Sequence, residues 1–385
     1  MKQLHIEKLV HGGLGLARTD QGITFISDVL PGENVEALLI SQQAGQQYAI
    51  PVTIVEPSLH RRKPPCAHFG ICGGCDWLFG DYEVQLSSKK EIFIECLTRI
   101  GKCSSFPAFD VFPSSEFGYR RRVQFKINTK QNAIGFYKRK TREVVPILHC
   151  PLLLPGLNTL LSDPGEIIQR LPPAFVQMKC IEGSQQCVAS FPVIIDRTFA
   201  YAKIHVGNHS FMVPGDGFFQ GNALLCEKLG TWGKNIVNGD YLVDLYGGVG
   251  FFSIMLHQCV KNGIIIDTVE SQIDCARQNL RNNHIAHIIA RTQSAELFLS
   301  ECALSGPSID CLIVDPPRTG LTRRVREGIV YCKPSTIFYI SCNPATQARD
   351  IGFFISNGGY SIEKMALFDL YPNTHHMETI VALRR

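Results

Sequence analysis

The sequence predicts an α/β protein in which a small N-terminal β-barrel and a β-rich middle segment precede a doubly wound parallel sheet. Three observations support this prediction. Short apolar segments separated by turns fill residues 1–58, strands and turns occupy most of 59–215, and continuous apolar runs alternate with helical patterns over 216–385. At roughly 150 residues per domain, a chain of 385 residues corresponds to two or three domains. We expect the domain boundaries at these three ranges.

The composition is that of a folded cytoplasmic protein. Hydrophobic residues make up 45% and charged residues 19% of the chain, which is enough to bury a core. No apolar run approaches the ~18 residues of a membrane span, and the N-terminus lacks the apolar core of an export signal. The 15 cysteines are therefore expected to be reduced, as core residues, metal ligands or nucleophiles. No membrane or protein partner is implied.

The first two parts are predicted from apolar patterning and turn residues. Barrel strands are expected at 4–10, 24–26, 35–40 and 49–55. A charged, proline-rich linker follows. Apolar residues at helical spacing then predict a helix between Gly80 and Gly101, with Gly101 in the position of a helix-terminating glycine. Strands return at 122–128 and 135–137.

Four runs in the last part are continuously apolar and do not alternate between apolar and polar residues, which is typical of strands buried on both faces of a parallel sheet. They are 241–245, 263–269, 309–314 and 336–340. The first is followed by the glycine-rich turn 244–250, where a ligand can approach the backbone at a helix N-terminus. Glu270, at the expected end of the second strand, can bind a ribose diol. This pattern fits NAD and S-adenosylmethionine alike, but the missing GxGxxG motif favours S-adenosylmethionine.

Two later strand ends carry candidate catalytic groups. The prolines after Asp315 stiffen the backbone and hold this carboxylate toward the ligand crevice. Cys342 precedes Asn343 and Pro344, which predict a helix cap and first turn, so the helix N-terminus should lower the pKa of the thiol. Glu378 heads a terminal strand. The preceding His375 and His376, if in a strand, would point to opposite faces, which argues against joint metal ligation.

Three cysteines in one glycine-containing loop, together with a remote fourth, suit a metal centre, because a soft metal takes four thiolate ligands. The set is Cys66, Cys72, Cys75 and Cys150. Spacing alone does not decide between zinc and an iron–sulfur cluster.

Net charge is only +4, yet basic residues cluster at 61–63, 120–122, 138–140 and 323–326. Such clusters form either solvated surface or phosphate contacts.

Several motifs together resemble the RNA uracil-C5 methyltransferases, and in particular the iron–sulfur branch that acts on 23S rRNA. They are Cys-x5-Cys-Gly-Gly-Cys, Phe-Phe-Gln-x-Asn at 218–222, Asp-Leu-Tyr-x-Gly-x-Gly, Asp-Pro-Pro-Arg-x-Gly-Leu, Ser-Cys-Asn-Pro-Ala-Thr and His-x-Glu-Thr. The resemblance covers nearly the whole chain. It implies a Rossmann-like class I methyltransferase domain, and a TRAM-like RNA-binding barrel (OB-like) at 1–58. The helix at about 80–105 would pack on the catalytic domain.

The resemblance also implies roles for individual residues. Cys342 would add to C6 of a flipped uracil, C5 would take the methyl group of S-adenosylmethionine, and Glu378 would remove the C5 proton. The residues that would contact S-adenosylmethionine are Gln220, Tyr246, Glu270 and Asp315. Cys66, Cys72, Cys75 and Cys150 would hold a [4Fe–4S] cluster, and the basic clusters at 61–63, 120–122 and 138–140 would contact RNA phosphates. Gly247 departs from the family, which usually has cysteine there.

Two other functions are compatible with parts of this pattern. A tRNA T-loop uridine methyltransferase would share the catalytic motifs, but that type lacks the barrel and the cysteine motif. A catalytically silent RNA-binding assembly factor would have lost Cys342, Glu378 or Gln220, and all three are present. The sequence therefore favours methylation of 23S rRNA.

Overall fold

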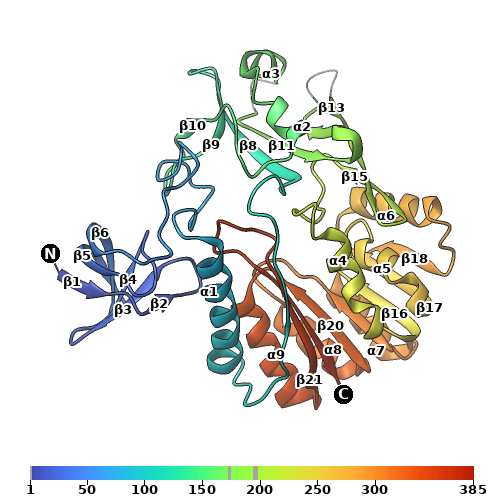
Figure 1. The fold of residues 1–385 in the computed structure, drawn as a ribbon. Coiled ribbons are helices and arrows are strands. Elements are labelled where there is room, and N and C mark those ends of the chain that lie inside the picture. The colour runs from blue at the N-terminus through green and yellow to red at the C-terminus, as the bar shows by residue number, and fades with distance from the viewer. Residues whose placement is uncertain (1, 172–174, 194–197) are drawn as a thin grey trace.

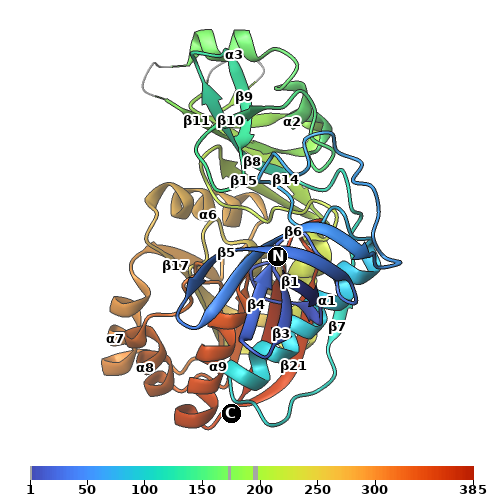
Figure 2. The same ribbon diagram turned by 90° about the vertical axis from the view of Figure 1, so that its left-hand side faces the viewer.

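The computed structural model describes residues 2–171, 175–193 and 198–385, and these residues form three parts (Figure 1). The N-terminal barrel stands to one side of the molecule, and a second β-sheet lies above a larger α/β part. Figure 2 shows the barrel in front of the α/β part, with the second sheet above both. The three parts meet around the cysteine-containing loop and the chain segment that precedes the last strand.

The N-terminal part is a six-stranded sheet rolled around a small apolar core that includes Ile6, Ile26 and Val35. Its strands, in the order β1-β5-β6-β4-β3-β2, are β1 (Lys2–His5), β2 (Lys8–Leu9), β3 (Gly15–Thr19), β4 (Gly22–Ile26), β5 (Asn34–Gln43) and β6 (Gln46–Glu56). The predicted strand 4–10 is interrupted, because the amides of Ile6 and Glu7 bond to different neighbours, Glu33 and Leu16.

The middle part is a six-stranded sheet with the order β10-β9-β8-β11-β12-β13 and a hairpin, β14-β15, beneath it. The bounds are β8 (Arg122–Asn128), β9 (Ala133–Tyr137), β10 (Val144–Pro146), β11 (Gln177–Glu182), β12 (Val188–Phe191), β13 (Thr198–Phe199), β14 (Tyr201–Val206) and β15 (His209–Pro214). The helices α2 (Pro155–Thr159) and α3 (Pro164–Arg170) and the short turn η2 (Ser184–Gln186) accompany this sheet. The hairpin packs on α6 and so joins this part to the next.

The α/β part is built on an eight-stranded sheet with the order β18-β17-β16-β19-β20-β22-β21-β7. Its strands are β7 (Asp110–Phe112), β16 (Gly239–Leu245), β17 (Val260–Asp267), β18 (Ile288–Thr292), β19 (Cys311–Val314), β20 (Thr336–Ser341), β21 (Ser361–Phe368) and β22 (Glu378–Arg384). All neighbouring pairs are parallel except those of β22, which runs antiparallel to β20 and β21. Apolar clusters cover both faces of the sheet.

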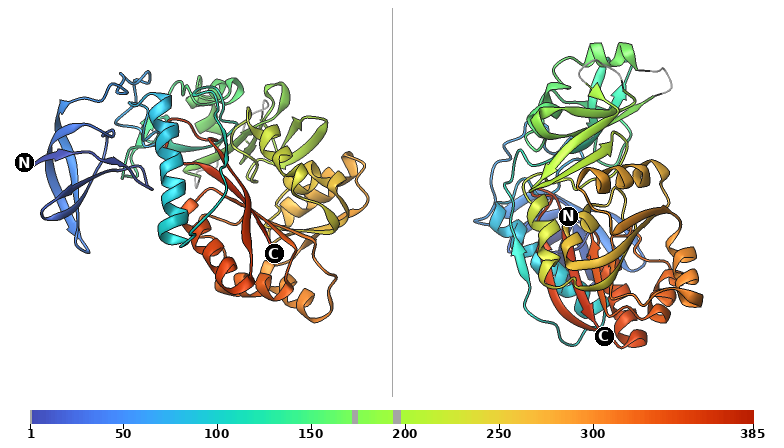
Figure 3. Two further views of the ribbon diagram at one scale, coloured as in Figure 1. Left: turned by 60° about the horizontal axis from the view of Figure 1, so that its bottom comes forward. Right: turned by 90° about the vertical axis from the view of Figure 1, so that its right-hand side faces the viewer.

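Helices flank this sheet on both sides (Figure 3). They are α4 (Cys226–Thr231), η3 (Trp232–Asn235), α5 (Phe251–Met255), η4 (His257–Cys259), α6 (Glu270–Asn282), α7 (Ala295–Ser305), α8 (Arg323–Cys332) and α9 (Pro344–Gly358). No helix among the described residues is both long and apolar enough to span a bilayer.

The helix predicted between Gly80 and Gly101 packs on α9, far along the chain (Figures 1 and 3). It consists of α1 (Tyr82–Glu95) and the π-helical turn η1 (Cys96–Ile100). Gly101 ends it with φ −71°, and the left-handed residue is Lys102, at φ 55°. Gly101 is needed for close packing instead, because a Cβ there would lie 2.9 Å from the carbonyl oxygen of Ala348 in α9.

Candidate active site

A small cavity opens where β16 and β19 end, at the edge of the sheet where ligands of doubly wound folds bind. It is lined by Phe218, Phe219, Gln220, Asp244, Tyr246, Gly247, Gly248, Val249, Phe251, Phe252 and Asp315. Gln220, Tyr246 and Asp315, three of the residues predicted to bind the cofactor, thus face one cavity. At Gly247 a side chain would collide with its neighbours, because Cγ2 of Ile265 lies 2.6 Å from the Cβ position.

Glu270, the fourth predicted residue, does not line this cavity, and the prediction that it ends a strand is wrong. The strand β17 ends at Asp267, whose carboxylate accepts the amide hydrogens of Gly248 at 3.0 Å and Val269 at 2.9 Å. Glu270 is the first residue of α6; its side chain is exposed and pairs with Arg277 at 3.3 Å. The acidic residue at the strand end is therefore Asp267, which the sequence interpretation missed.

Cys342 and Glu378 are brought together by the register of two antiparallel strands. Ser341, the last residue of β20, pairs with Thr379 of β22, so Cys342 and Glu378 extend this ladder side by side. Asn343 caps α9 as predicted, because its side chain accepts the amide hydrogens of Ala345 and Thr346. The same cap fixes Cys342 at the rim of the sheet.

Arg318, which follows the Asp-Pro-Pro segment, lies between these groups. Its guanidinium is close enough to the Cys342 thiol to act against the rise in the pKa of this thiol, and it lies 3.4 Å from Nε2 of His376. Its carbonyl oxygen accepts hydrogen bonds from Asn343 Nδ2 at 3.0 Å and Thr346 Oγ1 at 3.2 Å. The arginine is thereby held against the start of α9.

The expectation of a lowered pKa at Cys342 is wrong for the free protein. Burial raises the pKa of the thiol to about 12, the Glu378 carboxylate adds to the increase, and Arg318 opposes it. Burial together with the nearby Asp315 also raises the pKa of Glu378 well above its ordinary value. Burial and the charge of Asp244 raise the pKa of Asp315 as well. The free site therefore favours neutral groups.

His375 and His376 lie in the loop before β22 and not on opposite faces of a strand. Their ring centroids are 4.0 Å apart, and His375 Nδ1 lies 2.7 Å from Oδ2 of Asp76. Burial lowers the pKa of His376 to about 3, so its ring is neutral and can accept a hydrogen bond from Arg318.

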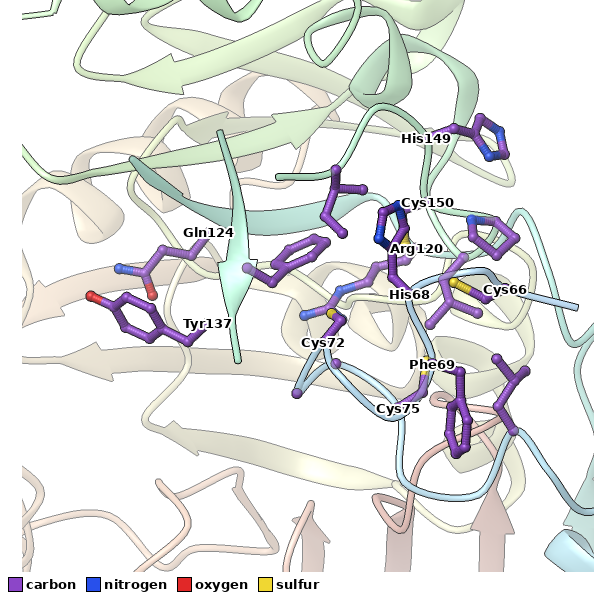
Figure 4. Close-up of a pocket in the computed structure, with 17 residues that line it drawn as sticks. Cys66, His68, Phe69, Cys72, Cys75, Arg120, Gln124, Tyr137, His149 and Cys150 are labelled. Atoms are coloured by element: carbon purple, nitrogen blue, oxygen red, sulfur yellow. The ribbon is translucent and has the colours of Figure 1, made fainter. Parts of the chain in front are cut away.

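The four predicted ligand cysteines line one separate cavity of about 290 Å³ (Figure 4). Cys66, Cys72 and Cys75 reach it from one loop, and Cys150 enters from the other side. Burial raises the pKa of Cys75, and negative charge on the other three thiols would raise it further, which places all four in electrostatic range. Within the described ranges, however, no set of three or more His, Cys, Asp or Glu side chains is arranged to hold a metal ion.

Most of the basic clusters are occupied by contacts within the protein. Arg61 pairs with the fully buried Glu33, and Arg62 with Glu116. Arg121 is buried, and Arg122 bonds to the carbonyl oxygen of Gly217 at 3.1 Å. These arginines thus have partners within the protein, whereas Lys63 and Lys140 are exposed; that the clusters contact RNA phosphates stays a prediction.

The sheet order, its antiparallel strand β22 and the cavity after β16 define the class I methyltransferase fold. A known structure supports this class: the tRNA (uracil-54, C5)-methyltransferase of Pyrococcus abyssi, in complex with S-adenosyl-L-homocysteine, has a TM-score of 0.77 to this chain. It shares 22% identity, over 99% of this chain and 100% of that protein.

Sequence comparison then identifies the family. The family model described as tRNA (Uracil-5-)-methyltransferase matches residues 186–385. An uncharacterized RNA methyltransferase of Aquifex aeolicus is 32% identical over 99% of this chain and 98% of its own length. The 23S rRNA (uracil(1939)-C(5))-methyltransferase RlmD of Marinomonas sp. is 27% identical over 100% of this chain and 95% of its own. The chain belongs to the S-adenosylmethionine-dependent RNA uracil-C5 methyltransferase family.

Proposed function

We propose that this protein methylates C5 of a uridine in 23S rRNA through a covalent adduct on Cys342. The observation that carries this proposal is the adjacency of Cys342 and Glu378, one residue beyond the Ser341–Thr379 pair. A nucleophile and a proton acceptor are thus next to each other, near the cavity that Gln220 and Asp315 line. The RlmD-named relatives support the choice of 23S rRNA.

The reaction follows from the chemistry of these groups. The Cys342 thiol releases its proton to water as RNA enters, and the Arg318 guanidinium stabilises the thiolate. The sulfur bonds to C6 of the uracil, which displaces an electron pair to C5. C5 then takes the methyl group of S-adenosylmethionine, and S-adenosylhomocysteine is the leaving group. Glu378 then takes the C5 proton, and the electrons of that C–H bond restore the C5–C6 double bond and expel the thiolate. Glu378 must first release its own proton to water, and its raised pKa then makes the carboxylate a stronger base for this step.

Cofactor binding is proposed for Gln220, Tyr246 and Asp315, which line the cavity, and for the carboxylates of Asp267 and Glu270 beside it, neither of which lines it. The turn after β16 places Tyr246 at φ 63° and Gly248 at φ 54°, which bends the backbone around the cavity. Asp267 orders this turn by accepting the amide hydrogen of Gly248. A carboxylate at the end of the second strand is where doubly wound folds bind a ribose diol.

The cysteine cavity suits a [4Fe–4S] cluster held by Cys66, Cys72, Cys75 and Cys150. Four thiols are the ligand set of such a cluster, and here they surround a cavity walled by apolar groups such as Phe69 and Ile147. Arg120 lines the same cavity and lowers the pKa of three of these thiols against the effect of burial. When bound, the cluster would cross-link the loop 66–75 to the segment around Cys150.

The division into an RNA-binding TRAM-like barrel at 1–58, a cysteine-containing middle domain at 59–215 and a catalytic domain at 216–385 completes the proposal. In this scheme α1 is an excursion of the middle domain onto α9 of the catalytic domain. The substrate is expected to be an extruded uridine, because a base inside a stack cannot meet a thiol at the rim of a sheet.

The test is to map 5-methyluridine in 23S rRNA and tRNA from cells with the active gene, without it, and with Cys342→Ala. We expect loss of one or more 23S rRNA sites in the last two strains. Loss from tRNA alone would instead identify a T-loop enzyme, which the likeness to the Pyrococcus abyssi protein keeps as the second candidate. An unchanged methylation pattern would indicate a silent assembly factor.

A further inference from the structure

Asn373 is a fully buried residue where the cysteine loop meets the segment that leads to Glu378. Its backbone joins two other parts of the chain. The carbonyl oxygen accepts the amide hydrogens of both Asp76 and Trp77, each at 3.1 Å, and these residues directly follow Cys75. Its own amide donates to Oε1 of Gln85 in α1 at 2.7 Å. The cysteine loop and α1 are therefore bonded to the backbone of the same residue.

The side chain of Asn373 adds bonds to two further segments. Its Oδ1 accepts from Arg62 Nη2 at 3.0 Å and from Gln85 Nε2 at 3.1 Å, and its Nδ2 donates to the carbonyl oxygen of Glu116 at 2.8 Å. Arg62 also pairs with the Glu116 carboxylate. Every polar atom of this asparagine thus has a partner inside the protein, which is the condition under which a buried polar group fixes a single arrangement.

The backbone of Asn373 explains why asparagine suits this position. Its φ of 68° lies in the left-handed region, which among non-glycine residues asparagine tolerates best. Glycine would keep the conformation and lose the side-chain bonds to Arg62, Gln85 and Glu116. This difference makes Asn373→Gly a clean test of the side chain.

The segment 369–377 connects this junction to the reaction site. Lys89 and Asp369 form a fully buried pair at 2.6 Å that fixes its start. Tyr119 Oη donates to the Pro372 carbonyl oxygen at 2.9 Å, and His375 bonds to Asp76. The strand β22 then begins at Glu378 itself. The segment 369–377 therefore links the cysteine loop to Glu378 through these bonds.

We propose that Asn373 is a positioning residue that holds Glu378 in register with the cysteine loop, so that filling of the cysteine cavity orders the carboxylate. This inference rests on the proposed function. It assigns to the cysteine centre a mechanical role at the proton-removal step and not at the methyl-transfer step. The residue does not touch the reacting atoms.

The first test measures amide hydrogen exchange of the peptide 369–378 in iron-loaded protein and after iron is removed by oxidation and chelation. In the wild type we expect removal of iron to raise the exchange rate of this peptide about 10-fold or more. The reason is that the filled cysteine cavity, acting through Asn373, suppresses local opening of the segment. In Asn373→Gly exchange should already be high and change less than about 2-fold on removal. Asn132→Gly is the matched control, since Asn132 also has a positive φ (48°) but lies exposed in a hairpin turn. Unchanged exchange in the wild type, or protein isolated without iron, would overturn the proposal.

The second test separates the two chemical steps with RNA that carries uridine or 5-fluorouridine at the target. With uridine, Asn373→Gly should turn over about 10-fold more slowly and accumulate covalent protein–RNA adduct, because C5 proton removal is slowed. With 5-fluorouridine no C5 proton exists, so adduct formation should stay within about 2-fold of the wild type. If turnover with uridine RNA and adduct formation with 5-fluorouridine RNA fell by the same factor, Asn373 would have a merely structural role. Failure of the wild type to form any adduct would overturn the proposed function, and the exchange experiment would still decide on Asn373.

Discussion

Glu378 stands beside Cys342 at the ends of two antiparallel strands, and its carboxylate opposes ionisation of the thiol. Burial acts in the same direction, while Arg318 acts against both. The free enzyme therefore holds a neutral, unreactive thiol, and the reactive form requires a change in its surroundings. In the proposed mechanism this change comes with the RNA, which brings the electrophilic uracil to the sulfur.

The first prediction concerns alkylation of Cys342 by iodoacetamide in the free protein. The reaction should be slow at pH 7.5 and accelerate toward the thiol pKa of about 12. Arg318→Gln removes the positive charge that favours the thiolate and should lower the rate at pH 9 by roughly 3- to 10-fold, whereas Glu378→Gln replaces a carboxyl that burial keeps largely neutral and should change the rate less than Arg318→Gln does. Rates are read by peptide mass spectrometry, with the exposed Cys187 as internal reference. Equal rates at Cys342 and Cys187 at pH 7.5 would contradict this account.

The central sheet could be predicted from the sequence because its strands are buried on both faces and read as continuous apolar runs. The strands β16, β17, β19 and β20 were found in this way. The strand β18 is half-exposed with only Ile288 buried, and β3 consists of Gly15–Thr19 with little apolar length, so neither carries such a run. The packing of Gly101 against α9 depends on a contact across the chain, which no local pattern encodes.

The second prediction is a pH dependence of stability caused by Asp244. Burial raises the pKa of this carboxyl from 3.8 to about 7. Between these values the unfolded chain ionises while the folded protein keeps its proton, so stability is lost as pH rises from about 4 to about 7 and is constant above. The loss is at most roughly 4 kcal/mol at ~1.4 kcal/mol per pKa unit.

Asp244→Asn should remove this dependence, since an amide does not titrate and its oxygen can still accept from Ser253 Oγ. Urea unfolding at pH 5 and pH 8 measures the effect. The free energy of unfolding of Asp244→Asn minus that of the wild type should be larger at pH 8 than at pH 5. The control is Asp240→Asn on the same strand, whose side chain is 70% exposed. An identical pH response of Asp244→Asn and the wild type would refute the assignment.

The proposed catalytic residues could be inferred from strand-end motifs, but their electrostatics could not. A cysteine before Asn343-Pro344 is correctly placed at a helix start, yet the depth of the thiol and the partner Glu378 come from strand pairing across the sheet. Asp267 was missed because it lies only three positions before Glu270, and the end of the strand is set by its pairing with β18.

The third prediction concerns RNA binding at the hairpin after β9. Lys140 is exposed, and it lines a cleft between this hairpin and the barrel turn at Gly12 and Gly13. Lys140→Ala should weaken RNA binding about 3- to 10-fold at low salt and reduce the slope of log K against log salt by about 0.7–0.9. The exposed Lys364 on β21 provides the control. An unaltered salt slope would exclude a phosphate contact at Lys140.

The last prediction tests the cysteine centre by its metal content. Protein purified without oxygen should contain about four iron and four acid-labile sulfide per chain, the composition of a [4Fe–4S] cluster. Cys150→Ala should lose both, because a cluster with three protein ligands is exposed to exchange. Cys180→Ala is the matched control: Cys180 is fully buried in the same apolar core that Cys150 borders, but does not line the cavity. Its iron content should equal that of the wild type, although the smaller side chain costs some stability. Stoichiometric zinc without sulfide would show that the site holds a single zinc ion and not a cluster. Equal iron loss in both variants would show that the substitutions act through folding and not through loss of a ligand.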